Sequence, residues 1–432
     1  MAKQKIIVIG GMIIVIAIIT VLLVARLTRN GKLVSQSNGN YLPINSKTAI
    51  SEISDDLVDS DKFNFVMYQD IQNVEKLFYI GWEGNNTSFI LKRYDIPSKQ
   101  LTSLTNSDST MYKIAYTGGD KIYLTKLTKY STNKLYDLYS YNLTNQQLTN
   151  ITDSENYTET IIGYTNEYVL LDVADLTPNA DPKHTKYSIY KTSDNTITTF
   201  LDTINTVLGM EIDGSKIVWS EEKSGNSDIF MYDITTGQTS TICDDPSNQE
   251  NPDICGDYIV WCDHRNDNHN YGKSQSKKDD TNSGDIYAYR ISTGKTFPVE
   301  NTSDSSIYPQ ISGSIATWHM SKKGSVNDLA TIMVADLSSP EITPIPASSE
   351  ISHKYPPLID GDMVVWMDMR QYKLGKINIY GYRISSGTEI QLTNTNGRDK
   401  IEWLSFPYLV YNHNNDIKNQ DGKGDLHIIK IR

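Results

Sequence analysis

One acidic stretch near the end of the sequence carries oxygen ligands at a spacing that suits calcium. Asn419, Asp421 and Asp425 surround a glycine and resemble part of a calcium-binding loop, which places glycine at its sharp turn. The first ligand position of such a loop falls on Ile417, and the nearest carboxylate is Asp416. Because Asp and Gly are also favoured in ordinary polar turns, a simple turn is the other interpretation. Apart from this calcium alternative, we expect no cofactor.

The histidines offer a second kind of chemistry, acid–base catalysis or metal binding. The chain has seven of them: His184, His264, His269, His319, His353, His413 and His427. No two have the helical spacing of a zinc site. Their convergence in a central pocket would support a lyase or hydrolase that acts on a polysaccharide, which is our alternative function. No Gly-x-Ser-x-Gly nucleophile elbow occurs, so we expect no serine peptidase domain.

A repeated phrase must position these residues. The sequence GDYIVWCDHR at Gly256–Arg265 returns as GDMVVWMDMR at Gly361–Arg370. Pro-x-Ile precedes the phrase, and Asp-Ile-Tyr or Asn-Ile-Tyr follows it, before a Thr-Gly or Ser-Gly turn. With weaker copies included, eight units follow one another at intervals of roughly 42 to 57 residues, a period typical of solenoids and propellers.

Each unit has the pattern of four short strands, which we name A to D in chain order. Pro-x-Ile lies in strand A, Ile-Val-Trp in B and Asp-Ile-Tyr in C, and D leads to the next unit. Short alternating strands between polar turns are typical of antiparallel sheet. A single sheet leaves both faces without partners, so stacking requires the same apolar set in each copy. We expect Ile259, Val260 and Trp261 to pack between neighbouring sheets.

The predicted fold class is therefore all-β, a β-propeller of four-stranded antiparallel blades. We predict eight blades, with seven as the alternative. Within strand B, Trp261, Asp263 and Arg265 fall on one side. The Asp-x-Arg pair is interpreted as a structural pair that ties strand B to strand C or to the next blade, and a ligand contact is the alternative.

The repeat resembles the TolB-type β-propeller repeat. The resemblance rests on the string Pro-x-Ile-x-Gly-Asp-x-Ile-Val-Trp-x-Asp-x-Arg, then Asp-Ile-Tyr-x-Tyr and a Thr-Gly turn. It is good in the units around Trp219, Trp261 and Trp366, fair around Trp318 and weak in the others, and all units together cover about 370 residues. It implies a propeller of a bacterial or archaeal envelope or surface protein that serves as a binding platform. We therefore expect a non-catalytic binding or scaffold module, not an enzyme.

The N-terminal region has a different composition. Residues 6–25 form an uncharged apolar run, long enough to cross a bilayer as a helix, after a short tail at residues 1–5. No small-x-small cleavage site follows, which favours an uncleaved membrane anchor. We predict a polar linker at residues 26–61 and the β-propeller at residues 62–432. The last unit lacks a fourth strand, so we expect Lys62–Tyr68 to pair with it and close the ring.

Charge and loop lengths indicate where a partner binds. The net charge of −12 argues against a nucleic-acid partner. Basic residues flank the apolar run on both sides and do not decide its orientation. From the family resemblance and the polar composition, we predict a single-pass cell-membrane protein with an extracytoplasmic propeller. It would bind a protein or a cell-envelope polymer.

Binding is expected at the end of the propeller that carries the long, varied B–C and D–A connections. The longest B–C connection is His264–Gly284. The predicted contact residues are Arg265, His269, Lys273, His353, Arg370 and Tyr372. The cysteines Cys243, Cys255 and Cys262 are expected to be unpaired structural thiols, because Cys255 and Cys262 flank a hairpin turn at positions too far apart for a disulfide.

Overall fold

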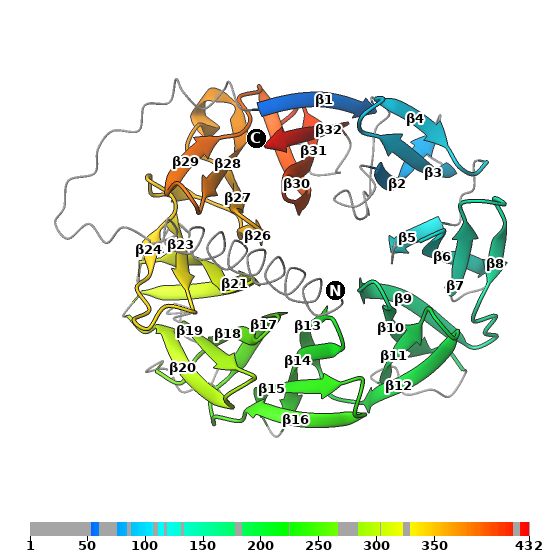
Figure 1. Ribbon diagram of the computed structural model, residues 1–432, viewed down its shortest axis with the longest axis horizontal. Helices are drawn as coiled ribbons and strands as arrows, with labels where there is room; N and C mark the ends of the chain where they lie inside the picture. Colours follow the sequence, from blue (N-terminus) through cyan, green and yellow to red (C-terminus); the bar gives the residue numbers. More distant parts are fainter. Residues whose placement is uncertain are drawn as a thin grey trace, which may run out of the picture.

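The described part of the chain is built from β-strands arranged as a ring. The computed structural model describes residues 53–59, 76–83, 88–106, 111–115, 119–130, 134–177, 184–223, 225–266, 284–302, 304–322, 329–417 and 424–431. Within these ranges the strands form several antiparallel sheets, placed side by side around a centre (Figure 1). The predicted all-β propeller is confirmed at this level.

The first half of the ring follows the chain in order. Its sheets are β2 (Lys76–Glu83), β3 (Ser88–Asp95) and β4 (Gln100–Ser103); β5 (Met111–Ala115), β6 (Lys121–Tyr130), β7 (Lys134–Asn142) and β8 (Leu148–Asn150); β9 (Tyr157–Tyr164), β10 (Tyr168–Asp175), β11 (Thr185–Lys191) and β12 (Thr196–Thr203); and β13 (Val207–Asp213), β14 (Lys216–Lys223), β15 (Asn226–Asp233) and β16 (Gln238–Cys243).

The second half continues the same pattern. Its groups are β17 (Gln249–Cys255), β18 (Tyr258–Asp263), β19 (Asp285–Arg290) and β20 (Lys295–Glu300); β21 (Ser305–Ser312), β22 (Ile315–Ser321), β23 (Leu329–Asp336), β24 (Ile345–Pro346) and β25 (Ser352–His353); β26 (Leu358–Asp360), β27 (Met363–Asp368), β28 (Lys376–Arg383) and β29 (Thr388–Gln391); and β30 (Gly397–Ser405), β31 (Tyr408–Asn414), β32 (Asp425–Ile431) and β1 (Ile53–Asp59). A short parallel pairing of β28 with β30 joins the last two groups.

The repeated phrase places its apolar side chains between neighbouring sheets. Ile259 and Trp261 of β18 pack in one cluster with Val218 and Ile229 of the preceding sheet. Val260, from the other side of β18, packs against the following sheet in a separate cluster. The prediction for these three residues is confirmed. Because adjacent side chains of a strand point to opposite faces, one phrase supplies both interfaces of its sheet.

Side chains at the ends of the inner strands connect each sheet to the next. The backbone N–H of Gly256 donates to Asp213 Oδ2 over 2.7 Å, and that of Phe406 donates to Asp360 Oδ2 over the same distance. The equivalent donors Gly313 and Gly361 bind the side chains of Cys255 and Ser312, respectively. Gly256 has φ +57, so glycine suits the tight turn that presents this N–H. A similar bond thus recurs at successive A–B turns.

The N-terminal strand closes the ring. β1 pairs antiparallel with β32, with Ile53 opposite Ile431 and Asp59 beside Leu426 (Figure 1). The predicted boundaries are therefore wrong here, because residues 53–59 were assigned to a linker and Lys62–Tyr68 to the closing strand. The strand was missed because it is acidic and has little apolar alternation. Residues 62–68 lie outside the described ranges.

β1 is held by polar contacts and by one buried apolar side chain. The Tyr411 hydroxyl donates to Asp55 over 2.8 Å, and Lys99 donates to Asp56 over 2.5 Å. Val58 is buried against Leu77, Val410 and Leu426, whereas its neighbour Leu57 is 53% exposed. Residues 53–59 form a strand here mainly because their backbone hydrogen-bonds to the open edge of β32, and less because apolar side chains are buried. In the described residues, no helix is long and apolar enough to cross a membrane. The predicted anchor at residues 6–25 lies outside them.

Two neighbouring substitutions test the closure. Val58→Asn should lower the free energy of unfolding by at least about 2 kcal/mol, because it removes a buried apolar side chain and buries an amide. Leu57→Asn should change it by less than about 0.5 kcal/mol, because Leu57 faces water. Denaturant unfolding of the full chain in detergent, followed by tryptophan fluorescence, measures both. Equal effects of the two variants would contradict closure by β1.

Candidate functional site

The two ends of the propeller differ in construction. We call the end with the A–B and C–D turns the turn face, and the end with the B–C and D–A connections the loop face. On the turn face, Ser292 donates to Asp257 through its N–H and its hydroxyl, over 2.7 and 2.6 Å. Ser385 binds Asp362 in the same way. The aspartate of each of these Gly-Asp turns therefore fixes the neighbouring C–D turn. Hydrogen bonds within the chain thus occupy polar groups on the turn face.

The Asp-x-Arg pair forms a compact cluster at the loop end of strand B. Trp366 donates its indole N–H to Asp368 Oδ2 over 3.0 Å, and Arg370 Nη2 donates to the same oxygen over 2.7 Å. The guanidinium lies 3.9 Å from the ring centre of Tyr380 on β28. Arg370 also binds Glu389 Oε1 over 2.6 Å. These contacts tie strand B to strands C and D, which supports the structural interpretation of the pair.

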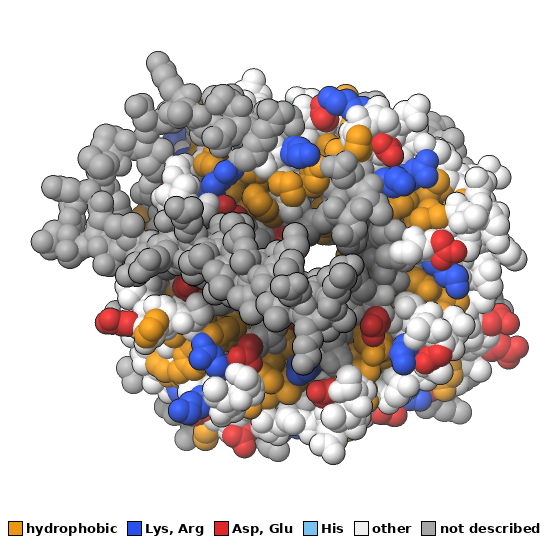
Figure 2. All heavy atoms as spheres, in the orientation of Figure 1, with side chains coloured by type: hydrophobic (Ala, Val, Ile, Leu, Met, Phe, Trp, Pro, Cys, Tyr) orange, Lys and Arg blue, Asp and Glu red, His pale blue; other side chains and the backbone are white. Residues whose placement is uncertain are grey.

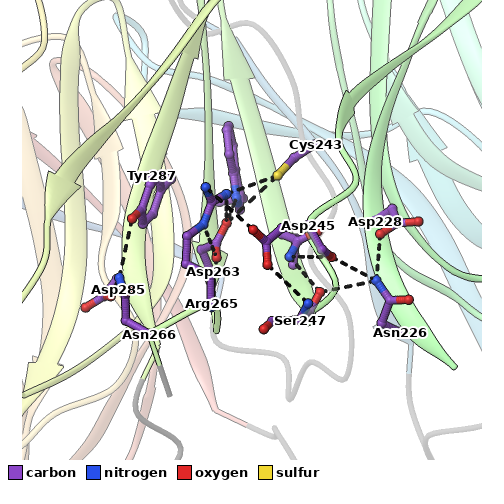
Figure 3. A network of polar contacts seen from close by, with 12 residues as sticks. Asn226, Asp228, Cys243, Asp245, Ser247, Asp263, Arg265, Asn266, Asp285 and Tyr287 are labelled. Atoms are coloured by element: carbon purple, nitrogen blue, oxygen red, sulfur yellow. Dashed lines mark hydrogen bonds and ion pairs between the residues drawn. The ribbon is translucent and has the colours of Figure 1, made fainter. Parts of the chain in front are cut away.

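The same cluster recurs in two other sheets. In one, Arg265 binds Asp263 over 2.7 Å and lies 4.2 Å from the ring centre of Tyr287 (Figure 3). In the other, Lys223 binds Glu221 over 3.0 Å and lies 4.0 Å from the ring centre of Phe230. A cation on an aromatic face, paired with a carboxylate, is thus part of the repeated framework.

Figure 3 shows how the Asp263 cluster reaches the preceding sheet. Arg265 Nη2 lies 3.2 Å from the sulfur of Cys243, at the end of β16. Its Nη1 lies 3.9 Å from Asp245, and the Asn226 amide donates to the Asp245 carbonyl over 3.0 Å. The guanidinium of Arg265 therefore bonds to groups of the chain itself. All three described cysteines are free thiols, as expected.

A buried lysine adds to the Asp368 cluster. Lys354 Nζ lies 3.6 Å from Asp368 and donates to the carbonyls of Ala330 and Glu350 and to the Ser352 hydroxyl. Burial lowers the pKa of Lys354 from its usual value. Burial also opposes the charge of Asp368, but its cationic neighbours outweigh this effect and hold the pKa of Asp368 below its usual range.

This lysine fixes the D–A segment that crosses the loop face. Ser352 and Lys354 point inward, whereas Ile351, His353 and Tyr355 are exposed. The N–H of Met369 donates to the His353 carbonyl over 2.9 Å, so the segment lies beside the B–C connection.

That connection forms a short 3₁₀ turn, η2 (Tyr372–Leu374), whose Tyr372 and Leu374 are also exposed. We call the five exposed residues Ile351, His353, Tyr355, Tyr372 and Leu374 the exposed patch.

The structure brings some of the predicted binding residues together. His353, Arg370 and Tyr372 belong to the same corner of the loop face, and Arg370 is only 10% exposed. Arg265 lies on β18, in another sheet. His269 and Lys273 fall outside the described residues.

The predicted calcium ligands are only partly described. Asp416 is exposed, and Asp425 begins β32, while Asn419 and Asp421 lie outside the described residues. In the described ranges, no group of three His, Cys, Asp or Glu residues is placed to hold a metal ion. Calcium binding stays a prediction.

The described histidines that make side-chain contacts occur in several sheets, and two of them, His413 and His427 on paired strands, have ring centres 6.2 Å apart. His184 pairs with Asp202, and His413 with Asp399. His427 lies 3.3 Å from Asp55, and His319 contacts the carbonyl of Lys354. These contacts link neighbouring strands and do not form one convergent group among the described residues.

Another polar group fixes a D–A connection elsewhere on the loop face. Asp137 of β7 accepts bonds from the Asn150 amide over 2.8 Å and from the Ser154 hydroxyl over 3.1 Å. The carboxylate of Glu159 lies 3.4 Å from the same hydroxyl and is buried. Burial, with the charge of Asp137, raises the pKa of Glu159 to about 7.

Sequence reasoning missed the residues that organise the exposed patch. Lys354 stands between polar and aromatic residues, and nothing in its neighbourhood predicts burial. Ile351 and Leu374 have the character of core residues. Glu389 belongs to the strand D pattern EIQLT, which gave no sign that it binds Arg370. The one available signal was the Asp-x-Arg pair, which points to a carboxylate and a cation in need of partners.

The placement of the repeat is that expected of a β-propeller. Pro-x-Ile lies on the inner strands, Trp-x-Asp-x-Arg on the second and Asp-Ile-Tyr on the third, around a ring closed by β1. The chain has the fold of a β-propeller. No family model matches it, and no curated protein is significantly similar in sequence. The solved structures that resemble this propeller include TolB from Acinetobacter baumannii, with 13% identity over 75% of this chain and 80% of that chain and a TM-score of 0.35.

Two peptidases give higher structural similarity. A prolyl endopeptidase matches 83% of the propeller chain and 55% of its own, with 12% identity and a TM-score of 0.54. Dipeptidyl peptidase 4 from Porphyromonas gingivalis matches 78% and 56%, with 8% identity and a TM-score of 0.51. The propeller chain therefore spans little more than half the length of either peptidase.

These matches overturn the expectation that this chain is not an enzyme. Enzymes are among the solved structures that resemble it. The physical reason is that a propeller is a scaffold whose loops carry function, so this fold is compatible with catalysis and with binding. Neither the repeat nor a missing nucleophile motif argues against an activity.

The Asp368 cluster can be tested with a matched pair of variants. Asp368→Ala should lower the free energy of unfolding by about 3–5 kcal/mol, because it leaves Lys354 and Arg370 buried without their carboxylate. Glu350→Ala should cost less than about 1 kcal/mol, because that partner of Arg370 lies at 3.8 Å and is 61% exposed. Chemical denaturation of both variants measures the difference, and a mild effect of Asp368→Ala would refute the framework role.

Glu159 should make stability depend on pH. Its pKa is about 7 in the folded chain and near the usual glutamate value of 4.5 when the chain is unfolded. Ionisation of Glu159 therefore lowers the free energy of unfolding. This loss grows as the pH rises from about 4.5 to about 7 and stays constant at higher pH. Glu159→Gln removes this loss, so the variant should gain stability relative to wild type between pH 4.5 and pH 8. Thermal melts of both proteins at these two pH values test this, and parallel shifts would contradict it.

Proposed function

We propose that the chain is an eight-bladed, membrane-anchored propeller that binds a protein or an envelope polymer through its loop face, outside the cytoplasm. The observation that carries this proposal is the exposed patch on the loop face. Exposed apolar groups that cluster, instead of lying singly, are typical of interaction sites. The turn face, by contrast, is consolidated by its own hydrogen bonds.

The eight-blade arrangement is supported by the strand grouping. The repeat pattern supplies a strand group for each of eight units, and β1 serves as the fourth strand of the last one. The shortest group, β2 to β4, follows residues that are not described.

The direction of β1 supports an outward-facing loop face. Ile53 lies beside Ile431, where strand C of the last unit reaches the turn face. The anchor at residues 6–25 is therefore joined to the propeller through that face. A tether at the turn face leaves the loop face available to partners that approach from the other side.

On the face seen in Figure 2, acidic and basic side chains are interspersed around the ring. They do not gather into one large basic surface there. This distribution and the net charge of −12 support a partner other than nucleic acid. No described cluster specifically favours the polysaccharide lyase or hydrolase, so we propose binding.

Removing a loop-face connection tests the proposal. Joining Asn266 to Gly284 should reduce recovery of the specific partner by at least about tenfold, equivalent to about 1.4 kcal/mol, with little change in melting temperature. The full chain would be cross-linked in intact cells, and co-purified components compared quantitatively with wild type. Thr236→Lys and Thr293→Lys, at exposed C–D turns, serve as controls. Loss of the partner in these controls, with retention in the loop variant, would reject the loop face.

A further inference from the structure

We propose that the exposed patch docks an extended, acidic segment of a partner protein that carries apolar side chains. This inference rests on the proposed function, because it specifies the partner of the same loop face. Its geometry, stiffness and charge each support this kind of partner.

The patch presents side chains along an extended backbone. Ile351, His353 and Tyr355 alternate with the inward-facing Ser352 and Lys354. In extended chain, residues two apart are separated by roughly 6.5–7 Å along the strand direction. A partner segment in the same conformation repeats its side chains at the same interval, so successive contacts stay in register.

Both backbone edges of this segment already have partners. Ser352 and His353 pair with β23 on one side. On the other side, the N–H of Tyr355 donates to the Met367 carbonyl, and the His353 carbonyl accepts from Met369. The partner must therefore be recognised through side chains, and addition of a strand to this edge is not the mode we propose.

The buried polar cluster holds the patch in a fixed shape. Lys354 Nζ binds three oxygen atoms of the segment and its neighbour β23, and the Ser352 hydroxyl donates to Asp368 over 2.7 Å. The N–H of Ser349 donates to Glu389 Oε2 over 2.8 Å. Since little ordering remains to be done on binding, the entropic cost of association is reduced.

The composition of the patch favours a protein over a polysaccharide. Leu374 is 72% exposed and Ile351 is 60% exposed, and neither side chain can hydrogen-bond to sugar hydroxyls. Tyr372, at 46% exposed, adds an aromatic anchor of the kind that concentrates binding energy in protein interfaces. Aliphatic and aromatic side chains of a partner segment fit this surface.

Charge around the patch favours an acidic partner. The Arg398 guanidinium lies 5.7 Å from the ring centre of Tyr355, and Lys376 Nζ donates to the neutral amide oxygen of Asn394. Lys373 is exposed within η2. These three cations outnumber the exposed Glu350 next to Ile351, so positive charge remains beside the patch, although the whole chain has a net charge of −12. Carboxylates on the partner would be attracted here, and more weakly as salt rises.

Short synthetic probes test the inference on the full chain in detergent. The probes are a fluorescent peptide that alternates glutamate and leucine, its lysine–leucine counterpart, and a fluorescent oligogalacturonide as an anionic polysaccharide. We expect saturable binding of the glutamate–leucine peptide in fluorescence anisotropy. The variants Leu374→Asp and Tyr372→Ala should each weaken it at least tenfold. Ile197→Asp, on the outer strand β12 and 45% exposed in wild type, is the matched control and should leave it unchanged.

Three results would overturn the inference: equal binding of the lysine–leucine peptide, binding of the oligogalacturonide alone, or affinity that the patch variants leave unaltered. Circular dichroism melts of the variants show whether a loss of binding reflects unfolding. Failure here is distinguishable from failure of the proposed function. Joining Asn266 to Gly284 would still remove the cellular partner if only the identity of the docking segment is wrong.

Discussion

The fold depends on burying both faces of every sheet against its neighbours. Trp219, Trp261, Trp318 and Trp366 are essentially inaccessible to water, and each belongs to a different sheet of the ring. Such burial is complete only if the ring closes, because an open ring would leave two sheet faces and the edge of β32 in water. β1 meets this requirement by pairing with β32 through its backbone. An acidic strand can serve because the backbone, and not a large apolar surface, makes most of the connection.

The repeated charges belong largely to the framework. A carboxylate accepts the tryptophan N–H and binds a cation that lies on an aromatic ring of the next strand, in three sheets. Burial makes these charges costly unless every partner is present, which explains why the residues occur together in the phrase. In the sheet that contains Asp368, the additional Lys354 extends the cluster to the D–A segment. There the framework also shapes the surface, since the same contacts hold Ile351, His353 and Tyr355 toward solvent.

The charged residues therefore act on a partner through the surface that they shape. Arg370 is engaged by Asp368 and Glu389, so its effect on a partner is to position η2 and the neighbouring segment. The peptidases among the similar structures show that chains containing related folds perform catalysis, while the described residues of this chain show a shaped, partly apolar surface. Binding at the loop face is compatible with either role of the whole protein, because recognition precedes chemistry.

The repeat pattern alone predicted the strands of the repeated units, their order and the interfaces between sheets, because the alternation of Ile259, Val260 and Trp261 shows which side chains must avoid water. It also indicated that Asp263 and Arg265 form a structural pair. It could not reveal that Ile53–Asp59 is the closing strand, since the partner edge at Asp425–Ile431 lies at the other end of the chain. Nor could it show that Lys354 is buried while Ile351 is exposed. Those outcomes depend on contacts between sheets far apart in sequence, where tertiary packing overrides the local preference of each residue.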